Sequence, residues 1–350
     1  MNKHTTAVIG ATGYTGVELV SILAAHPAFE MAAAVSREHA ASPLSALYPA
    51  LTGTDADLTL TDLAVFDPGS VEVVFLAVPH TTAMDQVATL REAGVRVIDL
   101  SADYRLEDAA LYEQWYDVAH RDVTHLSEAV YALPELTAHD AITAASILAC
   151  PGCYPTASAL AAAPLLASTL AQRDAPVIVD AKSGISGAGR KATEATSYCA
   201  IDESVSAYKV AAHQHTPEIE QTLSAAANRP VAVTFTPHLM PMKRGILATV
   251  YIRCTDDATV GAIHAIYETA YADEPFITVL PLGQQPRTAD VTGTNNAQIG
   301  VAFDKRTETA ILTCAIDNLG KGASSQAVQV ANIAFGLDQA TGLQPFRSIV

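Results

Sequence analysis

The chain has 350 residues, of which 50% are hydrophobic, and it carries 20 Lys and Arg against 37 Asp and Glu, a formal net charge of −17. This length predicts two domains of ordinary size, and the hydrophobic content excludes a disordered chain. The negative charge argues against nucleic acid and against a membrane surface as partners, because both bind basic faces. Five cysteines are too few, and odd in number, for a disulfide framework. With no apolar signal sequence at the N-terminus, we expect a reducing, cytoplasmic location.

The first 150 residues alternate short apolar runs with helical patterns. A β-prone run at 6–9 leads into the segment GATGYTG at 10–16 and then into a helical pattern at 17–25. Alternation of strands and helices predicts a doubly wound parallel sheet of the Rossmann type. We place this domain at 1–150 and expect a C-terminal helix within 320–350 to complete it. The other expected elements are strands at 31–35, 71–78, 95–100 and 142–149 and a helix at 84–93.

The pattern changes near residue 150. Strand-like runs then lie further apart, and one helical segment occurs at 258–271. This spacing fits an α+β domain over 151–319, with a mixed or antiparallel sheet and a covering helix. The fold class we expect is therefore α/β with a second, α+β domain. The expected strands of the second domain are 177–181, 231–236, 246–253, 298–303 and 309–316.

GATGYTG follows a strand and opens a helix, which is the setting of a dinucleotide-binding loop. Its three glycines permit a tight turn and a close approach of a pyrophosphate to the helix N-terminus, although a plain glycine turn is the alternative. The next strand ends in Ser36 and Arg37, where NAD-binding proteins place an acid for the ribose. A hydroxyl and a guanidinium suit a 2′-phosphate, so we predict NADP(H). The cofactor-binding residues predicted here are Gly10, Thr12, Gly13, Tyr14, Thr15, Gly16, Ser36 and Arg37.

CPGCYPT at 150–156 lies between a predicted strand and an Ala-rich helix. Cys153 is thereby placed at a helix N-terminus, where the helix dipole favours the nucleophilic thiolate. A redox pair of Cys150 with Cys153, half of a zinc site and a buried inert thiol are the alternatives. Zinc needs a second ligand pair and no other Cys-x-x-Cys occurs, so we predict no metal. At Cys150 a small apolar filler is favoured over a reversible disulfide.

HQHTPEI contains His213 and His215, which would share a face if they lay on a strand. Near a thiolate one of them would serve as general acid and base, because the pKa of imidazole lies near the operating pH. A metal pair and two surface imidazoles are the alternatives. SGISGAGRK at 183–191 has the composition of an anion-binding loop. Arg105 follows a strand at the sheet edge where ligands collect.

Taken together, these segments resemble one family. GATGYTGVEL, LSADYRL, PGCYPTA, SGISGAGR, HQHTPEI, FTPHLMPMKRGIL and DNLGKGASSQAVQ occur in its order from about residue 7 to 335. The chain resembles the N-acetyl-γ-glutamyl-phosphate reductases of arginine biosynthesis, which are relatives of aspartate-semialdehyde dehydrogenase. The resemblance implies a glyceraldehyde-3-phosphate dehydrogenase-like fold. It also implies NADPH-dependent reduction of N-acetyl-γ-glutamyl phosphate to the semialdehyde and phosphate, by a homodimer or homotetramer assembled through domain 151–319.

The resemblance also implies residue roles. Cys153 would form a thioester, His213 would be the acid and base, and His215 would bind substrate, with the two histidine roles exchanged as the alternative. Arg105 would hold the phosphate, and Arg244 or Lys209 the substrate carboxylate. The residues expected beside the nicotinamide half of the cofactor are Ser183, Gly184, Ser186, Gly187 and Asn318.

Three other functions stay open at this point. They are an N-acylated aminoadipyl-phosphate reductase of lysine biosynthesis, a non-catalytic NADP sensor on the same fold, and a cysteine hydrolase without a cofactor. Because the ligands implied by the resemblance are anions, the few bases should be concentrated at the site. We therefore predict positive potential around Cys153 and Arg37. The bases in or beside the motifs are Arg37, Arg105, Lys182, Arg190, Lys191, Lys209, Lys243, Arg244 and Lys321.

Overall fold

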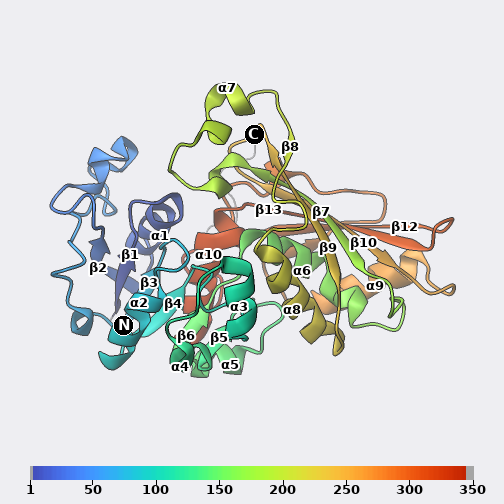
Figure 1. Ribbon diagram of the computed structural model, residues 1–350, viewed down its shortest axis with the longest axis horizontal. Helices are drawn as coiled ribbons and strands as arrows, with labels where there is room; N and C mark the ends of the chain where they lie inside the picture. The colour runs from blue at the N-terminus through green and yellow to red at the C-terminus, as the bar shows by residue number, and fades with distance from the viewer. Residues whose placement is uncertain (1–2, 344–350) are drawn as a thin grey trace. The chain divides into compact units, whose positions relative to one another are not determined.

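The computed structural model describes residues 3–343 and divides into two compact units (Figure 1). The first unit runs up to Pro151 and resumes at Ala323, and the second is Gly152–Gly322. These boundaries lie close to the positions 150 and 319 expected from the sequence. The predicted C-terminal helix is shorter than the range 320–350. It consists of a π-helical turn, Gly320–Ser324, and α10, Ser325–Ala334, while residues 344–350 lie outside the described part of the chain.

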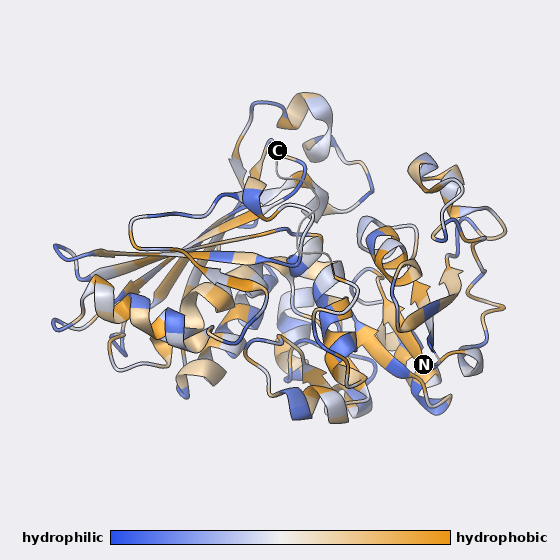
Figure 2. Cartoon of the chain, turned by 180° about the vertical axis from the view of Figure 1, so that it is seen from behind, coloured by the Kyte–Doolittle hydropathy of each residue, from blue (hydrophilic) through white to orange (hydrophobic). Residues whose placement is uncertain are grey.

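The first unit is built on a six-stranded sheet in which every neighbouring pair is parallel. Its strand order is β2-β1-β3-β4-β6-β5. This confirms the predicted doubly wound sheet. Figure 2 shows its central strands coloured as hydrophobic, as expected for strands buried on both faces. The strands are β1 (His4–Ile9), β2 (Phe29–Val35), β3 (Val73–Leu76), β4 (Arg96–Asp99), β5 (Ala129–Tyr131) and β6 (Ile147–Ala149).

Helices cover both faces of this sheet. Apolar residues of α1, α5 and α10 form one core with the strands, and those of α2 and α4 form the other. The strand expected at 142–149 is wrong in its first half, because Ile142 belongs to α5 and only the last three residues pair in the sheet. A short apolar run has no periodicity that separates a helix from a strand. The helices are α1 (Tyr14–Ala24), α2 (Met84–Glu92), α3 (Ala109–Tyr116), α4 (Val123–Leu126) and α5 (His139–Ala144).

The second unit contains a seven-stranded sheet of order β11-β12-β13-β10-β7-β9-β8. The pairs β7–β9 and β11–β12 are parallel and the other four are antiparallel, so the predicted mixed sheet is confirmed. Strands β8 and β11 have only two and three residues, too few for a sequence pattern to reveal them. The strands are β7 (Val177–Gly184), β8 (Ser206–Ala207), β9 (Val233–Met240), β10 (Ile246–Arg253), β11 (Ile277–Val279), β12 (Ala297–Asp304) and β13 (Thr309–Ile316).

Three helices cover a face of this sheet (Figure 1). The Ala-rich helix α6 (Cys153–Leu166) and helix α9 (Val260–Ala270) were expected, and α8 (His215–Ala227) was not. Helix α8 is absent from the predicted elements, because HQHTPEI was considered only for the face that its two histidines would share on a strand. A further short helix, α7 (Tyr198–Ile201), lies in the excursion between β7 and β8. No helix within residues 3–343 is both long and apolar enough to cross a lipid bilayer.

Helix α6 is almost completely buried although it contains Pro164. Proline has no N–H, so the carbonyl of Leu160, four residues earlier, loses its helical donor. The hydroxyl of Tyr271, at the end of α9, donates to that carbonyl over 2.7 Å. The hydroxyl of Tyr267, one turn earlier on α9, donates to the carbonyl of Ala161. Helix α9 therefore repairs the hydrogen bonding of α6 as well as packing on it.

The substitution Tyr271→Phe removes this donor and leaves a buried carbonyl without its tyrosine partner. An unsatisfied buried acceptor costs about 1–3 kcal/mol, so we expect the free energy of unfolding in urea to fall by that amount. Tyr251→Phe, at a half-buried tyrosine of β10, is the matched control and should cost about 0.5 kcal/mol or less. Equal losses in the two variants would contradict this account of α6.

Candidate active site

The loop between β1 and α1 is shaped by two glycines that cannot be replaced without collision. Gly10 has φ +88°, and a Cβ there would lie 2.3 Å from the carbonyl oxygen of Ala77. A Cβ at Gly16 would lie 2.1 Å from the carbonyl oxygen of Gly10. Gly13 differs, because it is the N-cap of α1 without a side-chain cap, and a Cβ there would come no closer than 3.6 Å to its neighbour, the carbonyl oxygen of Gly10. The start of α1 is thus an uncapped helix N-terminus beside open space, which fits a pyrophosphate.

Tyr48 fixes this loop from a distant part of the chain. Its hydroxyl donates to the carbonyl of Thr12 over 2.9 Å, while the N–H of Gly13 donates to the carbonyl of Gly10. The peptide between Thr12 and Gly13 is therefore held at both ends, which orients the following N–H groups of Tyr14 and Thr15. Tyr48 was not predicted as a site residue, since a tyrosine between two short 3-10 turns, Leu44–Ala46 and Pro49–Leu51, carries no motif.

The end of β2 places Ser36 and Arg37 next to each other, as the sequence requires, but in different surroundings. Ser36 is buried and its N–H donates to the carbonyl of Thr61, whereas Arg37 is exposed. A buried hydroxyl beside an exposed guanidinium suits one phosphate group. The segment before α10 belongs to the same unit, and there the hydroxyl of Ser324 donates to the carbonyl of Thr15.

Cys153 is the first residue of α6, and Gly152 is the N-cap with no side-chain cap. The N–H of Gly152 donates over 2.7 Å to a carboxylate oxygen of Glu218, which is buried in α8. The peptide between Pro151 and Gly152, one residue before Cys153, is therefore fixed by a buried acid. Glu218 is the glutamate of the HTPE sequence, so it lies within the motif that contains the two histidines. The sequence did not show that its hydrogen-bond partner would be Gly152, which lies in the cysteine motif.

His213 lies just before α8 inside a cage of rings and is only 9% exposed. Its Nδ1 accepts a hydrogen bond from the backbone N–H of His215 at 3.1 Å. In the neutral ring the proton must then reside on Nε2, which can donate to a ligand. The ring centroid of His213 lies 4.8 Å from that of His215, 5.3 Å from Phe235, 5.5 Å from Tyr208 and 5.7 Å from Tyr154.

Burial, with the positive charge of Lys209 acting in the same direction, lowers the pKa of His213 to about 4. The ring is consequently neutral at physiological pH. A neutral imidazole with Nε2–H is a hydrogen-bond donor toward an oxygen that develops negative charge.

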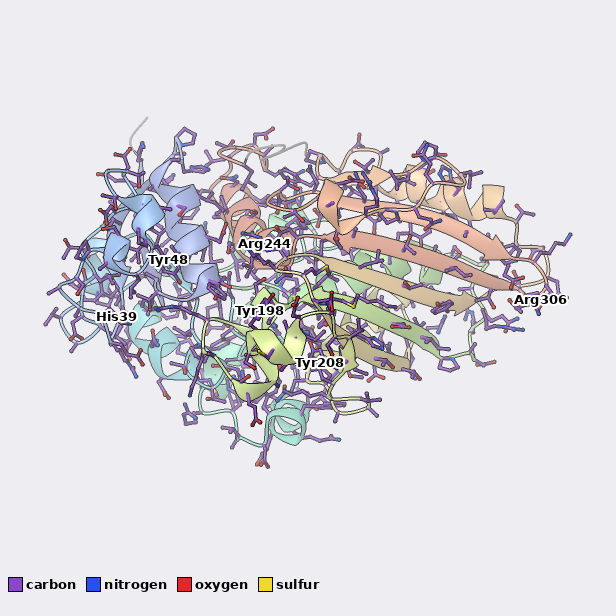
Figure 3. All side chains as sticks on the ribbon, turned by 90° about the horizontal axis from the view of Figure 1, so that it is seen from above. His39, Tyr48, Tyr198, Tyr208, Arg244 and Arg306 are labelled. Carbon is purple, nitrogen blue, oxygen red and sulfur yellow. The ribbon has the colours of Figure 1, made fainter. Side chains whose placement is uncertain are left out.

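Two tyrosines accompany Cys153. The hydroxyl of Tyr208 donates to that of Tyr154 over 3.0 Å. Burial raises the pKa of Tyr208 to about 12, and a negative charge on Cys153 acts in the same direction on both phenols. Both side chains therefore stay protonated close to the thiol. Figure 3 labels Tyr208 on its segment before α8. Neither tyrosine was predicted, although Tyr154 lies within the cysteine motif.

The structure brings together the residues predicted for the nicotinamide half of the cofactor. Asn318 donates through Nδ2 to the hydroxyl of Ser186 over 2.9 Å and accepts through Oδ1 from the N–H of Gly245. A Cβ at Gly187 would lie 3.1 Å from the hydroxyl of Ser183 and 3.6 Å from Asn318. Gly184 ends β7, where a Cβ would lie 2.8 Å from the backbone nitrogen of Arg244.

The predicted substrate cations all have partners within the protein. Arg105 is buried and donates to the carbonyls of Cys150 and Leu100. Lys209 donates to the side chain of Gln214 over 2.6 Å. The Nε of Arg244, which Figure 3 labels, lies 2.9 Å from a carboxylate oxygen of Asp317. Their roles toward a substrate, like the positive potential expected at the site, stay predictions.

Cys150 is buried in the core of the first unit. Burial raises the pKa of its thiol, and the negative charge of Asp99 raises it further. The thiolate is thus strongly disfavoured, which supports a packing role and leaves the disulfide hypothesis untested. Among residues 3–343 no three His, Cys, Asp or Glu side chains gather as a metal site would require.

Comparisons with known proteins cover nearly the whole chain. Residues 5–144 match the family model "Semialdehyde dehydrogenase, NAD binding domain", and residues 153–318 match "Semialdehyde dehydrogenase, dimerisation domain". The N-acetyl-γ-glutamyl-phosphate reductase of Moorella thermoacetica is 46% identical, covering 96% of this chain and 97% of that protein. The reductase of the same name from Heliobacterium modesticaldum is 47% identical, covering 97% of each.

Solved structures show the same fold at lower identity. Aspartate semialdehyde dehydrogenase II of Vibrio cholerae, complexed with ASA, has a TM-score of 0.74 at 17% identity and covers 96% of this chain and 99% of that one. The Candida albicans aspartate semialdehyde dehydrogenase with NADP has a TM-score of 0.69 at 15% identity, covering 95% and 98%. These two structures support the fold alone.

The low pKa of His213 predicts a pH dependence of stability. The unfolded ring, with pKa near 6.5, binds a proton between pH 6.5 and 4 that the folded ring rejects, so stability falls as the pH falls through this window. From pH 7 to 4 the wild type should lose about 2–3 kcal/mol more than His213→Gln in urea unfolding. His139→Gln, at an exposed histidine, should behave as wild type. Identical pH dependence in wild type and His213→Gln would contradict the burial argument.

Tyr48→Phe removes only the hydroxyl that holds Thr12. We expect the Kd of NADPH, measured by fluorescence titration, to rise about 3–10-fold, the effect of one hydrogen bond. Adenosine 2′-monophosphate, which lacks the pyrophosphate, should bind as tightly as before. Tyr198→Phe, at a tyrosine that is 76% exposed, is the control. Equal weakening of both ligands by Tyr48→Phe would mean that Tyr48 does not act on the pyrophosphate loop.

Proposed function

Since this chain belongs to the family of N-acetyl-γ-glutamyl-phosphate reductases, within the semialdehyde dehydrogenases, we propose that it uses NADPH to reduce N-acetyl-γ-glutamyl phosphate. The products are N-acetylglutamate 5-semialdehyde and phosphate, and the reaction serves arginine biosynthesis. The observation that carries the proposal is Cys153 at the uncapped N-terminus of α6, in the same unit as a buried neutral His213.

Cys153 acts as the nucleophile. Its thiolate attacks the carbonyl carbon of the acyl phosphate, a C–S bond forms, and the C–O bond to phosphate breaks to give a thioester. The helix dipole of α6 favours the thiolate form. NADPH, when bound, supplies the hydride for reduction. The resulting hemithioacetal collapses with return of the thiolate, because sulfur is both a good nucleophile and a good leaving group.

His213 holds the proton at Nε2 toward the reacting oxygen. The hydrogen bond that its Nδ1 accepts from the His215 N–H fixes this tautomer. A donor preorganised in a buried site stabilises the negative charge of the tetrahedral states more than it would in water. When the hemithioacetal collapses, its hydroxyl proton returns to the site. His215 binds the substrate in this scheme, and the exchange of roles between the two histidines is the alternative.

Ser36 and Arg37 support NADPH as the cofactor, since these two residues, and not an acid, come directly after β2 where NAD-binding proteins hold the ribose. Arg105 is assigned to the phosphate of the substrate, and Lys209, beside His213, to its carboxylate. The residues of the second unit assigned to the cofactor are Ser183, Gly184, Ser186, Gly187 and Asn318. A homodimer or homotetramer assembled through Gly152–Gly322 completes the proposal.

Cys153→Ser tests the mechanism directly. Phosphate-dependent reduction of NADP by N-acetylglutamate semialdehyde should fall by about 10³-fold or more, because the weaker oxygen nucleophile cannot replace the thiolate. Cys199→Ser, at the exposed cysteine, is the matched control and should keep full activity. Turnover that survives in Cys153→Ser would overturn the thioester mechanism.

The same assay separates the alternative functions. The kcat/KM for N-acetylglutamate semialdehyde should exceed that for the homologue one methylene longer by about 10–200-fold. The reverse order would indicate the aminoadipyl enzyme. Binding of NADPH without turnover of either substrate would indicate the sensor, and turnover of an acyl substrate without cofactor would indicate a hydrolase.

A further inference from the structure

The segment that follows β13, here called the 317–322 loop, lies directly against Cys153. A Cβ at Gly322 would lie 2.8 Å from the Cβ of Cys153 and 3.2 Å from its Cα. The first of these distances is shorter than real Cβ contacts show, so no side chain fits at position 322 unless the loop or the cysteine moves. The space available to the thiol therefore depends on where this loop is held.

Asp317 holds the loop. Its carboxylate is fully buried and accepts hydrogen bonds from the N–H groups of Leu319 at 2.8 Å and Gly320 at 3.1 Å, and from that of Gly293. Its backbone carbonyl accepts from the N–H of Gly322 at 2.9 Å. The loop is thus folded around one acidic side chain, which fixes the glycine that contacts the cysteine.

Arg244 supplies the counter-charge. Its Nε lies 2.9 Å and 3.2 Å from the two carboxylate oxygens of Asp317. Asp317 is fully buried and the Arg244 side chain is 19% exposed, so removing Arg244 would leave a buried carboxylate without its counter-charge, which is destabilising. A Cβ at Gly320 would lie 2.3 Å from the carbonyl oxygen of Thr294, so the loop is confined on its other side as well.

We propose that Asp317 and Gly322 are positioning residues for Cys153. The Arg244–Asp317 pair fixes the 317–322 loop, and the backbone of Gly322 sets the place of the thiol at the start of α6. Arg244 accordingly serves Asp317 through its Nε, whereas the family resemblance offered Arg244 or Lys209 for the substrate carboxylate. The proposal rests on the proposed function only in taking Cys153 as the nucleophile. A displacement of about 1 Å in a reacting group lowers the rate about 10²-fold. Contacts that hold Cys153 in place should therefore affect kcat even though they do not touch the substrate.

The test measures the thiol itself, without substrate or cofactor. Cys199 is the other cysteine that is not buried, so all variants carry Cys199→Ser. The rate at which iodoacetamide alkylates Cys153 is measured as a function of pH, and its plateau at high pH is the rate of the fully ionised thiol. Gly322→Ala should change this plateau rate by fivefold or more. Its kcat should fall about 10²-fold with KM within threefold. Gly261→Ala, at a glycine with no atom within 4 Å of the added Cβ, is the matched control.

Asp317→Asn and Arg244→Gln extend the test, with Asp180→Asn as control for a half-exposed ion-paired aspartate. Both should repeat the result of Gly322→Ala, with binding of 2′,5′-ADP to the first unit within twofold of the parent. Circular dichroism checks that each variant is folded. If Asp317→Asn is not folded, the result for Gly322→Ala alone decides the proposal.

Two results would overturn the proposal. One is a folded Gly322→Ala whose alkylation rate and kcat stay within twofold of Gly261→Ala. The other is an Arg244→Gln that raises KM at unchanged kcat, which would return Arg244 to the substrate. Failure of the parent to reduce the acyl phosphate would reject the proposed function, whereas the alkylation rates would still judge the positioning.

Discussion

The hydrogen bond between the Gly152 N–H and the buried Glu218 carboxylate is the contact on which the site of the second unit depends. It joins the start of α6 to the first turn of α8, two helices that pack closely together. Cys153 and His215 begin these two helices, and His213 lies two residues before α8. A buried carboxylate needs its donors, so a helix register that moved Glu218 away from Gly152 would be costly. The same bond thereby fixes Cys153 and His213 in one region.

Burial is the common cause of the chemistry found there. It keeps His213 neutral, and it keeps protonated the phenols of Tyr154 and Tyr208, the two tyrosines on which the charge of Cys153 acts. The buried charge of Asp317 is compensated within the protein by Arg244. The shortage of bases in the chain has a related consequence, since Arg244 is held in an internal ion pair. Internal neutralisation and substrate binding compete for the same few cations.

Much of the fold could be predicted, because its strands have strong local patterns. The bounds of 246–253 and 309–316 were reproduced as β10 and β13, and the parallel sheet of the first unit follows from apolar runs separated by helices. The failures have physical causes. The run 142–149 is apolar enough for either state, and its first half became α5. Helix α8 was missed, because HQHTPEI was considered only for its two histidines and the apolar face of the helix packs on α6, which lies far away in the sequence.

By itself the sequence determined the glycine loop, the position of Cys153 at a helix start, the histidine pair and the family. These features are local, since each needs only a few neighbouring residues in one order. Tertiary structure alone decided the partners: Glu218 for Gly152, 66 residues apart, Arg244 for Asp317, 73 apart, and the glycine of the 317–322 loop against Cys153. Such pairings depend on which distant chain segments the packing of the core brings into contact. A local pattern of residue types does not show which of these segments will meet.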